Sequence, residues 1–266
     1  MTSSSSELVT YARDGDVALI GLNRPAKRNA IDDAVLLAIE TAVVRAQAEA
    51  KIGLIFGHGE HFSSGLDLAE HAGRSPAEGL HGSMRWHTVF DRIDRGGIPF
   101  VSALHGAVIG GGLELAAATH IRVADATAFF ALPEGKRGIF VGGGGAVRIA
   151  RLMGLARMTD LMLTGRVVPA DEADAYNIAQ YFVPAGAAKT KAMEIARQIA
   201  ANAPLSNFAV INALPRIQNM SQDDGLFFES IVAALTQTSP EARQRMKDFL
   251  EKRAEPIAAA AKAKKP

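Results

Sequence analysis

The alternation of short apolar strands with amphipathic helices constrains the fold of this chain more than any other feature. Residues 17–22 (VALIGL) are predicted to form a buried strand, and from about Asp32 apolar residues recur at the three- and four-residue steps of a helix. A second strand is predicted over residues 52–56. Short links between a strand, a helix and a strand favour a parallel pair joined by a crossover helix. The sequence therefore predicts an α/β fold.

The same order continues along the chain. Further strands are predicted over residues 100–104, 121–124 and 127–132, and a glycine run precedes each of two helices. Residues 63–80, which are rich in Gly, Ser and Ala, are predicted as a mobile loop that leads into a helix over residues 83–95.

Two domains are expected. The strand–turn–helix order runs without a linker through residues 1–190, which we expect to form the core domain. Beyond Ala185 the pattern is helical, so residues 191–266 are expected to form a helical C-terminal region. Its last segment (IAAAAKAKKP) has no second apolar face and is predicted to be a frayed basic tail.

Composition excludes several classes of function. Cysteine is absent, which excludes disulfides, thiolate zinc sites, iron–sulfur clusters and a cysteine nucleophile. The 29 Lys and Arg residues nearly balance 28 Asp and Glu, so binding to nucleic acid or to an anionic membrane is not expected. The N-terminal segment does not resemble a secretory signal, and no apolar run is long enough to span a bilayer. We therefore expect a cytoplasmic protein.

The first of two glycine runs lies next to a carboxylate. Gly110, Gly111 and Gly112 precede Glu114 at an expected strand–helix junction. Unpaired N–H groups at the start of a helix favour an oxyanion or a phosphate, and Glu114 lies in the same first turn. The alanines that follow it favour burial, which raises the pKa of a carboxyl group. A first-turn Glu also stabilises a helix without any catalytic role, so this segment alone leaves both interpretations open.

The second carboxylate is Glu134, which is followed by the glycine run 142–145. Pro-Glu-Gly on its own is typical of a surface turn. Two carboxylates around an oxyanion-binding backbone, however, suit proton transfer next to a carbonyl group. A third segment, residues 61–68 (HFSSGLDL), follows the second strand and offers the other N–H of a two-donor oxyanion hole.

Other chemistries fit the sequence less well. The glycine runs lack the Lys-Ser/Thr of a P-loop and the GxGxxG pattern of dinucleotide-binding folds. His58 and His61 stand close enough in sequence to form a metal pair, but most such pairs in turns bind nothing, and no metal site is predicted. Ser102 and His105 lie in an expected buried strand, without the nucleophile elbow of a serine hydrolase.

Together these segments resemble the crotonase superfamily, the enoyl-CoA hydratase/isomerase family. The motifs that carry the resemblance occur in order between about residues 10 and 255: Leu22-Asn23-Arg24-Pro25 with Asn29-Ala30, residues 62–68 (FSSGLDL), residues 110–116 (GGGLELA), Leu132-Pro133-Glu134 with the second glycine run, Leu163-Thr164-Gly165 and residues 249–253 (FLEKR). The family implies a crotonase-like spiral of repeated ββα units with a C-terminal helical trimerisation region. It also implies acyl-CoA thioesters as substrates, a homotrimer or dimer of trimers, and no cofactor apart from the coenzyme A of the substrate.

The resemblance implies roles for individual residues. The backbone N–H groups of Leu66 and Gly111 would hold the thioester oxygen, Glu114 would deprotonate water for attack at C3, and Glu134 would deliver a proton to C2. The chain would thus be an enoyl-CoA hydratase, or a dehydratase in the reverse direction. Substrate contacts are expected from Ser64, Gly65, Asp67, Met84, Trp86, Lys136, Arg137 and Gly142, and coenzyme A contacts from Arg24, Lys27 and Ala30.

The chain departs from the family pattern near the second carboxylate. Gly135-Lys136-Arg137 stand where many hydratases have apolar residues, Val141 replaces a usual Pro, and His120 replaces a common Asp. If Lys136 or Arg137 is turned inward, we expect it to favour ionised Glu134 or to recognise a polar or anionic acyl group. An isomerase that uses mainly Glu134 and a weakly catalytic acyl-CoA-binding protein are the alternative functions.

Overall fold

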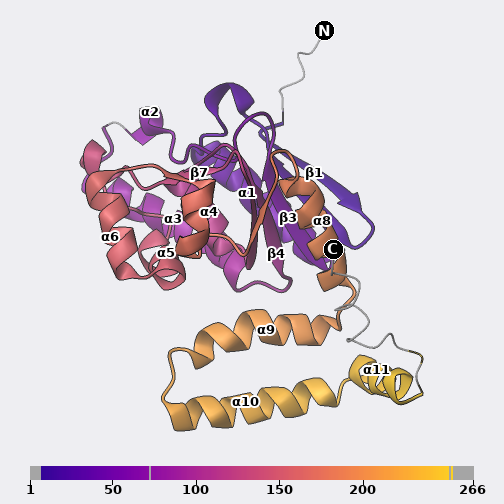
Figure 1. The fold of residues 1–266 in the computed structure, drawn as a ribbon. Helices are drawn as coiled ribbons and strands as arrows, with labels where there is room; N and C mark the ends of the chain where they lie inside the picture. The colour runs from indigo at the N-terminus through magenta and orange to yellow at the C-terminus, as the bar shows by residue number, and fades with distance from the viewer. Residues whose placement is uncertain (1–6, 72, 252, 254–266) are drawn as a thin grey trace. The chain divides into compact units, whose positions relative to one another are not determined.

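The computed structural model describes residues 7–71, 73–251 and 253. The chain divides into two compact units, Met1–Ala201 and Asn202–Pro266. The first contains two β-sheets with their helices, and the described part of the second contains α9 (Pro204–Ile217), α10 (Gln222–Gln237) and α11 (Pro240–Leu250) (Figure 1). The predicted basic tail lies outside the described residues.

The larger sheet has the strand order β1–β2–β3–β4–β6–β9. The first pair, β1 (Val9–Asp14) and β2 (Val17–Leu22), is antiparallel, and the sheet continues in parallel through β3 (Ile52–Gly57), β4 (Phe100–Leu104), β6 (Ile121–Asp125) and β9 (Tyr181–Val183). Helix α1 (Asp33–Glu49) connects β2 to β3, so the predicted crossover between two parallel strands is confirmed.

Both faces of this sheet are covered by other elements, which explains why its strands are almost wholly apolar. Alternate residues of a strand point to opposite faces. Ile55 and Leu104 pack into the core that includes α1, whereas Leu54 and Val101 pack against helix α8 (Ala188–Ala200) on the other side. Because α8 covers the sheet, the first unit extends to Ala201, eleven residues beyond the expected boundary at residue 190.

The smaller sheet brings the two carboxylate motifs together. Strands β5 (Ala107–Ile109) and β7 (Phe129–Ala131) are parallel, with Ile109 opposite Ala131, and β8 (Val168–Pro169) pairs with β7. The carboxyl ends of parallel strands lie at one edge of a sheet. The segments that follow, with Glu114 after β5 and Glu134 after β7, therefore start side by side, and the Gly110 N–H donates to the Ala131 carbonyl at 3.0 Å.

The predicted loop over residues 63–80 is partly wrong. The structure has α2 (Leu68–His71) there and the first turns of α3 (Pro76–Asp94). Ser75 caps α3 and exchanges hydrogen bonds with Glu78 in a capping box, which is a sequence signal for the start of a helix. The loop prediction rested on the small residues of the segment and did not use this signal. The remaining elements are η1 (Pro25–Lys27), α4 (Gly111–Ala118), η2 (Gly135–Arg137), α5 (Gly145–Met153), α6 (Leu155–Thr164), α7 (Ala170–Ala173) and η3 (Asp174–Tyr176). None of the described helices has the length and apolarity needed to cross a membrane.

Candidate active site

Helix α4 carries the first carboxylate into the core. Its N-cap, Gly110, has φ 52° and ψ −122°, a conformation that requires glycine. All residues of α4 are buried, and Glu114 is only 4% exposed. Oε1 of Glu114 accepts hydrogen bonds from the backbone N–H groups of Gly143 and Gly145, each at 2.8 Å.

Burial and hydrogen bonding act in opposite directions on Glu114. Burial, the larger effect, raises the pKa of its carboxyl group, and the N–H groups of the second glycine run lower it by stabilising the ionised form. The net pKa is raised, as the alanine-rich helix predicts. The N–H groups of the glycine run thus offset part, but not all, of the effect of burial on the pKa of Glu114.

Glu134 lies in the turn between β7 and η2 and is also buried. Its pKa is raised to about 7, chiefly by burial and further by the charge of Glu114, while Arg137 lowers it. Oε2 is buried and, among the described residues, has no hydrogen-bond partner. A carboxyl group that titrates near neutrality and has an oxygen without a fixed partner is suited to proton transfer.

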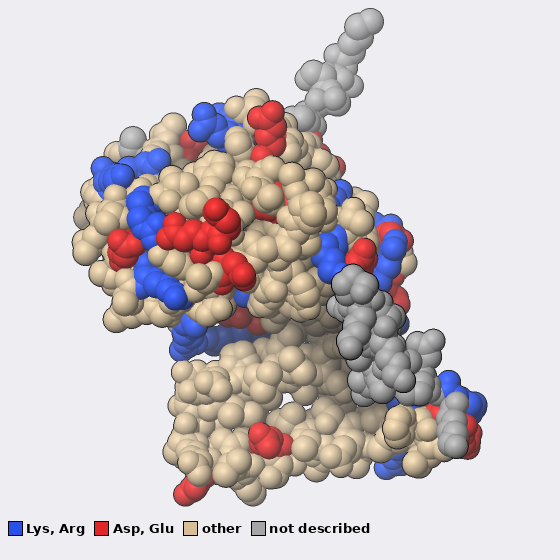
Figure 2. Space-filling model, in the orientation of Figure 1, with Lys and Arg blue, Asp and Glu red and all other residues tan. Residues whose placement is uncertain are grey.

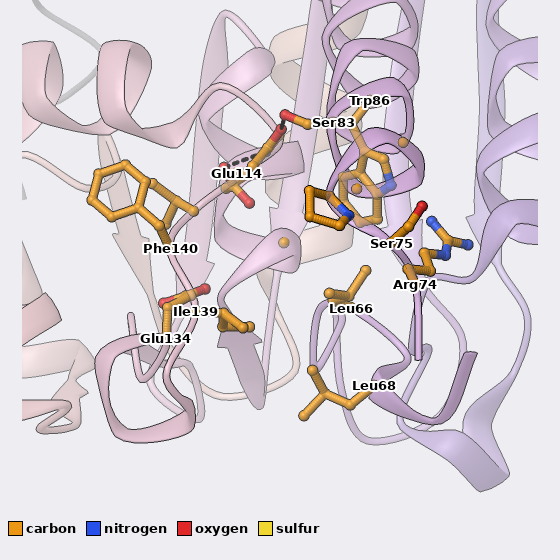
Figure 3. Close-up of a pocket in the computed structure, with 17 residues that line it drawn as sticks. Leu66, Leu68, Arg74, Ser75, Ser83, Trp86, Glu114, Glu134, Ile139 and Phe140 are labelled. Carbon is orange, nitrogen blue, oxygen red and sulfur yellow. Dashed lines mark hydrogen bonds between the residues drawn. The ribbon is translucent and has the colours of Figure 1, made fainter. Parts of the chain in front are cut away.

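Both carboxyl groups line one cavity of about 540 Å³ (Figure 3). They come from different elements, α4 and the turn after β7, and glycine lets each approach the backbone. A Cβ atom on Gly110 would lie 2.6 Å from Oε1 of Glu134, and one on Gly143 would lie 3.2 Å from the carboxyl carbon of Glu114. Side chains at these two positions would therefore collide with the site.

Two backbone N–H groups lie close together at the same cavity. Leu66 and Gly111 both line it, and a Cβ atom on Gly111 would lie 3.3 Å from the Leu66 nitrogen. In the described segment around Leu66, the bonds from Ile31 N to Gly65 O and from Asp67 N to Ile31 O flank the Leu66 N–H. Gly111 is the first residue of α4, where an N–H group has no acceptor within its own helix. This geometry suits an oxyanion hole.

Only some of the other predicted substrate contacts line the cavity. Trp86 and Gly142 line the cavity, whereas Met84 is exposed and is not part of its wall. Gly65 lies beside the N–H group of Gly111: a Cβ atom on Gly65 would be 2.8 Å from the Gly111 nitrogen. Its φ of 85° also favours glycine.

Lys136 and Arg137 do not line the cavity. The Lys136 stem packs on Gly165, and its Nζ donates to the Gly165 carbonyl at 3.1 Å, so the expectation that it faces the substrate is wrong. The charge of Arg137 does favour ionised Glu134, but burial outweighs it.

A second hollow of about 290 Å³ includes several residues predicted to bind coenzyme A or the substrate. It is lined by Ala26, Lys27, Arg28, Ala30, Ser64 and Asp67. Arg24 is not in this lining: it contacts the carboxylates of Asp32 at 2.8 Å and Asp67 at 3.4 Å. Lys27 also contacts Asp67, at 3.1 Å, and lowers its pKa. Arg24 and Asp67 thus link the two loops that form the hollow.

Sequence reasoning missed most of the cavity wall. Between residues 68 and 89, substrate contacts are predicted only from Met84 and Trp86. The wall from this stretch includes Leu68, Arg74, Ser75, Pro76, Gly79, Gly82 and Ser83, and the facing segment adds Ile139, Phe140 and Val141. The helical spacing of residues 75, 79, 82, 83 and 86 was the signal that could have identified this face of α3.

The two histidines considered for a metal pair have other contacts. Nε2 of His58 lies 2.8 Å from the Thr10 hydroxyl, and Nδ1 of His61 accepts the Ala107 N–H at 3.1 Å. No group of three or more His, Asp or Glu side chains within residues 7–71, 73–251 and 253 is placed to hold a metal ion.

Comparison with known proteins supports the fold and the family. The structure resembles a crystal structure from Rhodopseudomonas palustris, whose assignment as an enoyl-CoA hydratase is provisional, with a TM-score of 0.90, 49% identity and coverage of 92% of this chain and 95% of that chain. It also resembles an enoyl-CoA hydratase from Thermoplasma volcanium, with a TM-score of 0.88, 28% identity and coverage of 93% and 99%. The predicted crotonase-like α/β fold is therefore confirmed.

Sequence comparison agrees. The chain is 30% identical to the enoyl-CoA hydratase EchA19 of Mycobacterium tuberculosis over 91% of this chain and 93% of the relative. It is also 30% identical to the 2,3-dehydroadipyl-CoA hydratase of Escherichia coli, over 93% and 97%. The family model "Enoyl-CoA hydratase/isomerase" matches residues 12–258. The chain therefore belongs to the enoyl-CoA hydratase/isomerase family, within the crotonase superfamily that its motifs resemble.

Proposed function

We propose that this protein is an enoyl-CoA hydratase, which adds water across the 2,3 double bond of an acyl-CoA thioester or catalyses the reverse dehydration. The observation that carries the proposal is the pair of buried carboxyl groups, Glu114 and Glu134, which line one cavity beside two backbone N–H groups. Relatives named as hydratases over nearly the whole chain support it.

The N–H groups of Leu66 and Gly111 bind the thioester oxygen. As water adds to C3, negative charge moves onto this oxygen, and fixed donors stabilise it more than they stabilise the neutral carbonyl group. Loss of a donor of this kind typically raises the barrier by about 3–4 kcal/mol. A backbone donor needs no particular side chain, so Leu at position 66 is compatible with this role.

The two carboxyl groups divide the proton transfers. Glu114, which is held by N–H groups that favour its ionised form, orients water and accepts its proton. Glu134, with a pKa raised to about 7, is partly protonated at neutral pH and gives its proton to C2 of the enolate. Each positioned acid or base contributes about 10²–10⁴-fold to the rate.

The coenzyme A portion is proposed to bind at the second hollow, where Lys27 and Ala30 lie next to the loop of Leu66. Acid–base catalysis by two carboxyl groups needs no cofactor beyond the substrate's own coenzyme A. A homotrimer or dimer of trimers and a cytoplasmic location stay predictions from the resemblance and the sequence.

Isomerisation is the second candidate. Shifting a double bond needs one group that removes and returns a proton, and Glu134 alone has a buried oxygen without a partner among the described residues. In that case Glu114 would help only to shape the site.

Turnover of crotonyl-CoA, followed by loss of the enoyl thioester absorbance, tests these functions. We expect the wild type to hydrate it, and both Glu114→Gln and Glu134→Gln to lose about 10²–10⁴-fold in kcat. Glu194→Gln, at an exposed position on α8, is the matched control and should keep full activity. An isomerase would tolerate Glu114→Gln and convert 3-enoyl-CoA to 2-enoyl-CoA, and a binding protein would show no turnover in any variant.

A further inference from the structure

Helix α3 contacts the second glycine run through one hydroxyl group. Oγ of Ser83 donates to the carbonyl oxygen of Gly142 at 2.6 Å, and it also lies 3.4 Å from Nε2 of His87, one turn further along α3. A hydroxyl group has a single proton and a carbonyl oxygen only accepts. The proton of Ser83 is therefore directed at Gly142.

The Gly142 carbonyl group and the Gly143 N–H group belong to one planar peptide unit. In a trans peptide these two groups point in opposite directions, so fixing one fixes the other. The Gly143 N–H donates to Oε1 of Glu114 at 2.8 Å. Ser83 and Glu114 thus hold the same peptide unit from its two sides (Figure 3).

The next peptide unit is held from α5. Nη1 of Arg148 donates to the Gly143 carbonyl at 3.2 Å, and its guanidinium group is itself bound by Asp91 and by Asp94 of α3. Glycine peptides have more conformational freedom than any others, so a glycine run keeps one conformation only where its surroundings hold it. Here Ser83 holds the Gly142–Gly143 peptide, one of two peptides whose N–H groups donate to Oε1 of Glu114.

We propose that Ser83 is a positioning residue for Glu114: its hydroxyl group fixes the Gly142–Gly143 peptide, and this peptide in turn fixes the orientation and ionisation of the carboxylate. The proposal deepens the proposed function, because it assigns to α3 a role in the water-activating half of the site. It also explains why a polar side chain occupies this point of a largely apolar wall.

The direction of the effect follows from hydrogen bonding. An N–H group that donates to a carboxylate stabilises its charged form and lowers its pKa. Without the Ser83 hydroxyl group the peptide regains rotational freedom, and its N–H contact with Oε1 weakens. The pKa of Glu114 is therefore expected to rise when this hydroxyl group is removed.

Other charged groups surround this part of the site. The charge of His87 lowers the pKa of Glu114, Arg148 lies against Gly144 together with His87, and Asp91 and Asp94 bind Arg148. Glu134 faces the same cavity and interacts electrostatically with Glu114. Ser83→Ala changes none of these side chains, although it also removes the contact of the hydroxyl group with Nε2 of His87. A changed titration of Glu114 therefore reports the loss of the hydroxyl group.

Carbon-13 NMR titration of the full chain, labelled at the Glu carboxyl groups, tests the proposal without needing turnover. Glu114→Gln assigns the signal of Glu114. Ser83→Ala is expected to raise its pKa by about half a unit to one unit, the effect of losing about one hydrogen bond. Ser83→Thr keeps a hydroxyl group and should retain the wild-type value. Thr88→Ala removes a hydroxyl group that bonds only within α3, to the Met84 carbonyl, and is the matched control.

Kinetics with crotonyl-CoA provide the second readout. In Ser83→Ala the acidic limb of the kcat/KM profile should move to higher pH, and kcat should fall about tenfold with little change in KM. A Glu114 signal that titrates as in the wild type overturns the proposal, and a rise in KM alone would then make Ser83 only part of the cavity wall. If the wild type does not hydrate crotonyl-CoA, the proposed function fails, and the NMR titration still decides the role of Ser83.

Discussion

Burial of Glu134 makes the stability of the folded protein depend on pH. Its pKa is raised from 4.5 to about 7 in the folded protein, because burial disfavours the charged form. Below pH 4.5 both states are protonated, and between pH 4.5 and about 7 the unfolded state ionises Glu134 while the folded state keeps it neutral. The stability associated with neutral Glu134 is therefore lost over this pH window.

Glu134→Gln is expected to remove that loss. The neutral amide does not ionise, so the variant should have a higher Tm than the wild type at about pH 8 and nearly the same Tm at about pH 4.5. Thermal unfolding at both pH values measures the difference, with Glu194→Gln as an exposed control. A Tm difference that is equal at the two pH values would contradict the burial argument.

Gly110 provides a second test at the scale of one residue. Gly110→Ala places a Cβ atom 2.6 Å from Oε1 of Glu134 in a backbone conformation with φ 52°. Gly138→Ala has a comparable φ of 70° but meets nothing within 4 Å, so it reports backbone strain alone. Gly138→Ala should lose about 1–2 kcal/mol of stability. Gly110→Ala should lose more, because its ψ of −122° lies outside the left-handed region and its Cβ atom meets Glu134, and only this variant should lose most of its activity. Equal activity in the two variants would show that Gly110 serves the turn and not the site.

At the scale of elements, the strands and helices that the sequence predicted are those whose packing is repetitive. Strand β3 is apolar throughout because both faces of the sheet are covered, and α1 has a regular apolar face. Strand β1 was missed because it is the edge strand, with most of its residues at least partly exposed. The start of α3 was missed because Ser75, Gly79 and Gly82 are residue types typical of a loop. In the structure they share one face of the helix, and this face lines the cavity.

The face of α3 predicts a substrate preference. Arg74 is the cation among the described residues that line the cavity, and it binds Asp33 at 3.0 Å. Because a guanidinium group has several donors, we expect Arg74 also to bind an acyl group that ends in a carboxylate. Arg74→Gln should raise KM about tenfold for such a substrate and leave KM for crotonyl-CoA unchanged. Arg85→Gln is the matched control, since Arg85 contacts the same Asp33 at 3.5 Å but does not line the cavity. An equal effect on both substrates would contradict this preference.

At the scale of the whole molecule, the sequence predicted the two carboxyl groups of the cavity better than the rest of its lining. Glu114 and Glu134 each lie beside a glycine run, and the parallel pairing of β5 with β7 brings the two motifs together. The contact of Ser83 with Gly142 joins residues that are far apart in sequence, and no local pattern marks it. Lys136 was misplaced for the same reason, because its position depends on packing against Gly165.

The C-terminal unit predicts self-association. Helices α9 and α10 expose large apolar side chains, and the surface that they present in Figure 2 is mostly uncharged. These side chains are Phe208, Val210, Leu214, Leu226, Phe227, Ile231 and Leu235. Extended apolar surface of this kind is uncommon on a monomer, and the family resemblance implies a homotrimer or a dimer of trimers, so we expect further copies of this chain to be the partner.

Phe227 is 70% exposed, so Phe227→Glu is expected to place a charge in the subunit contact without disturbing the core. Light scattering coupled to gel filtration should give the mass of a trimer or of two trimers for the wild type and a smaller mass for the variant. Glu229→Lys alters a charge at an exposed position of the same helix and should leave the wild-type mass unchanged. A monomeric wild type would contradict the prediction, because the exposed apolar side chains of α9 and α10 would then face water permanently.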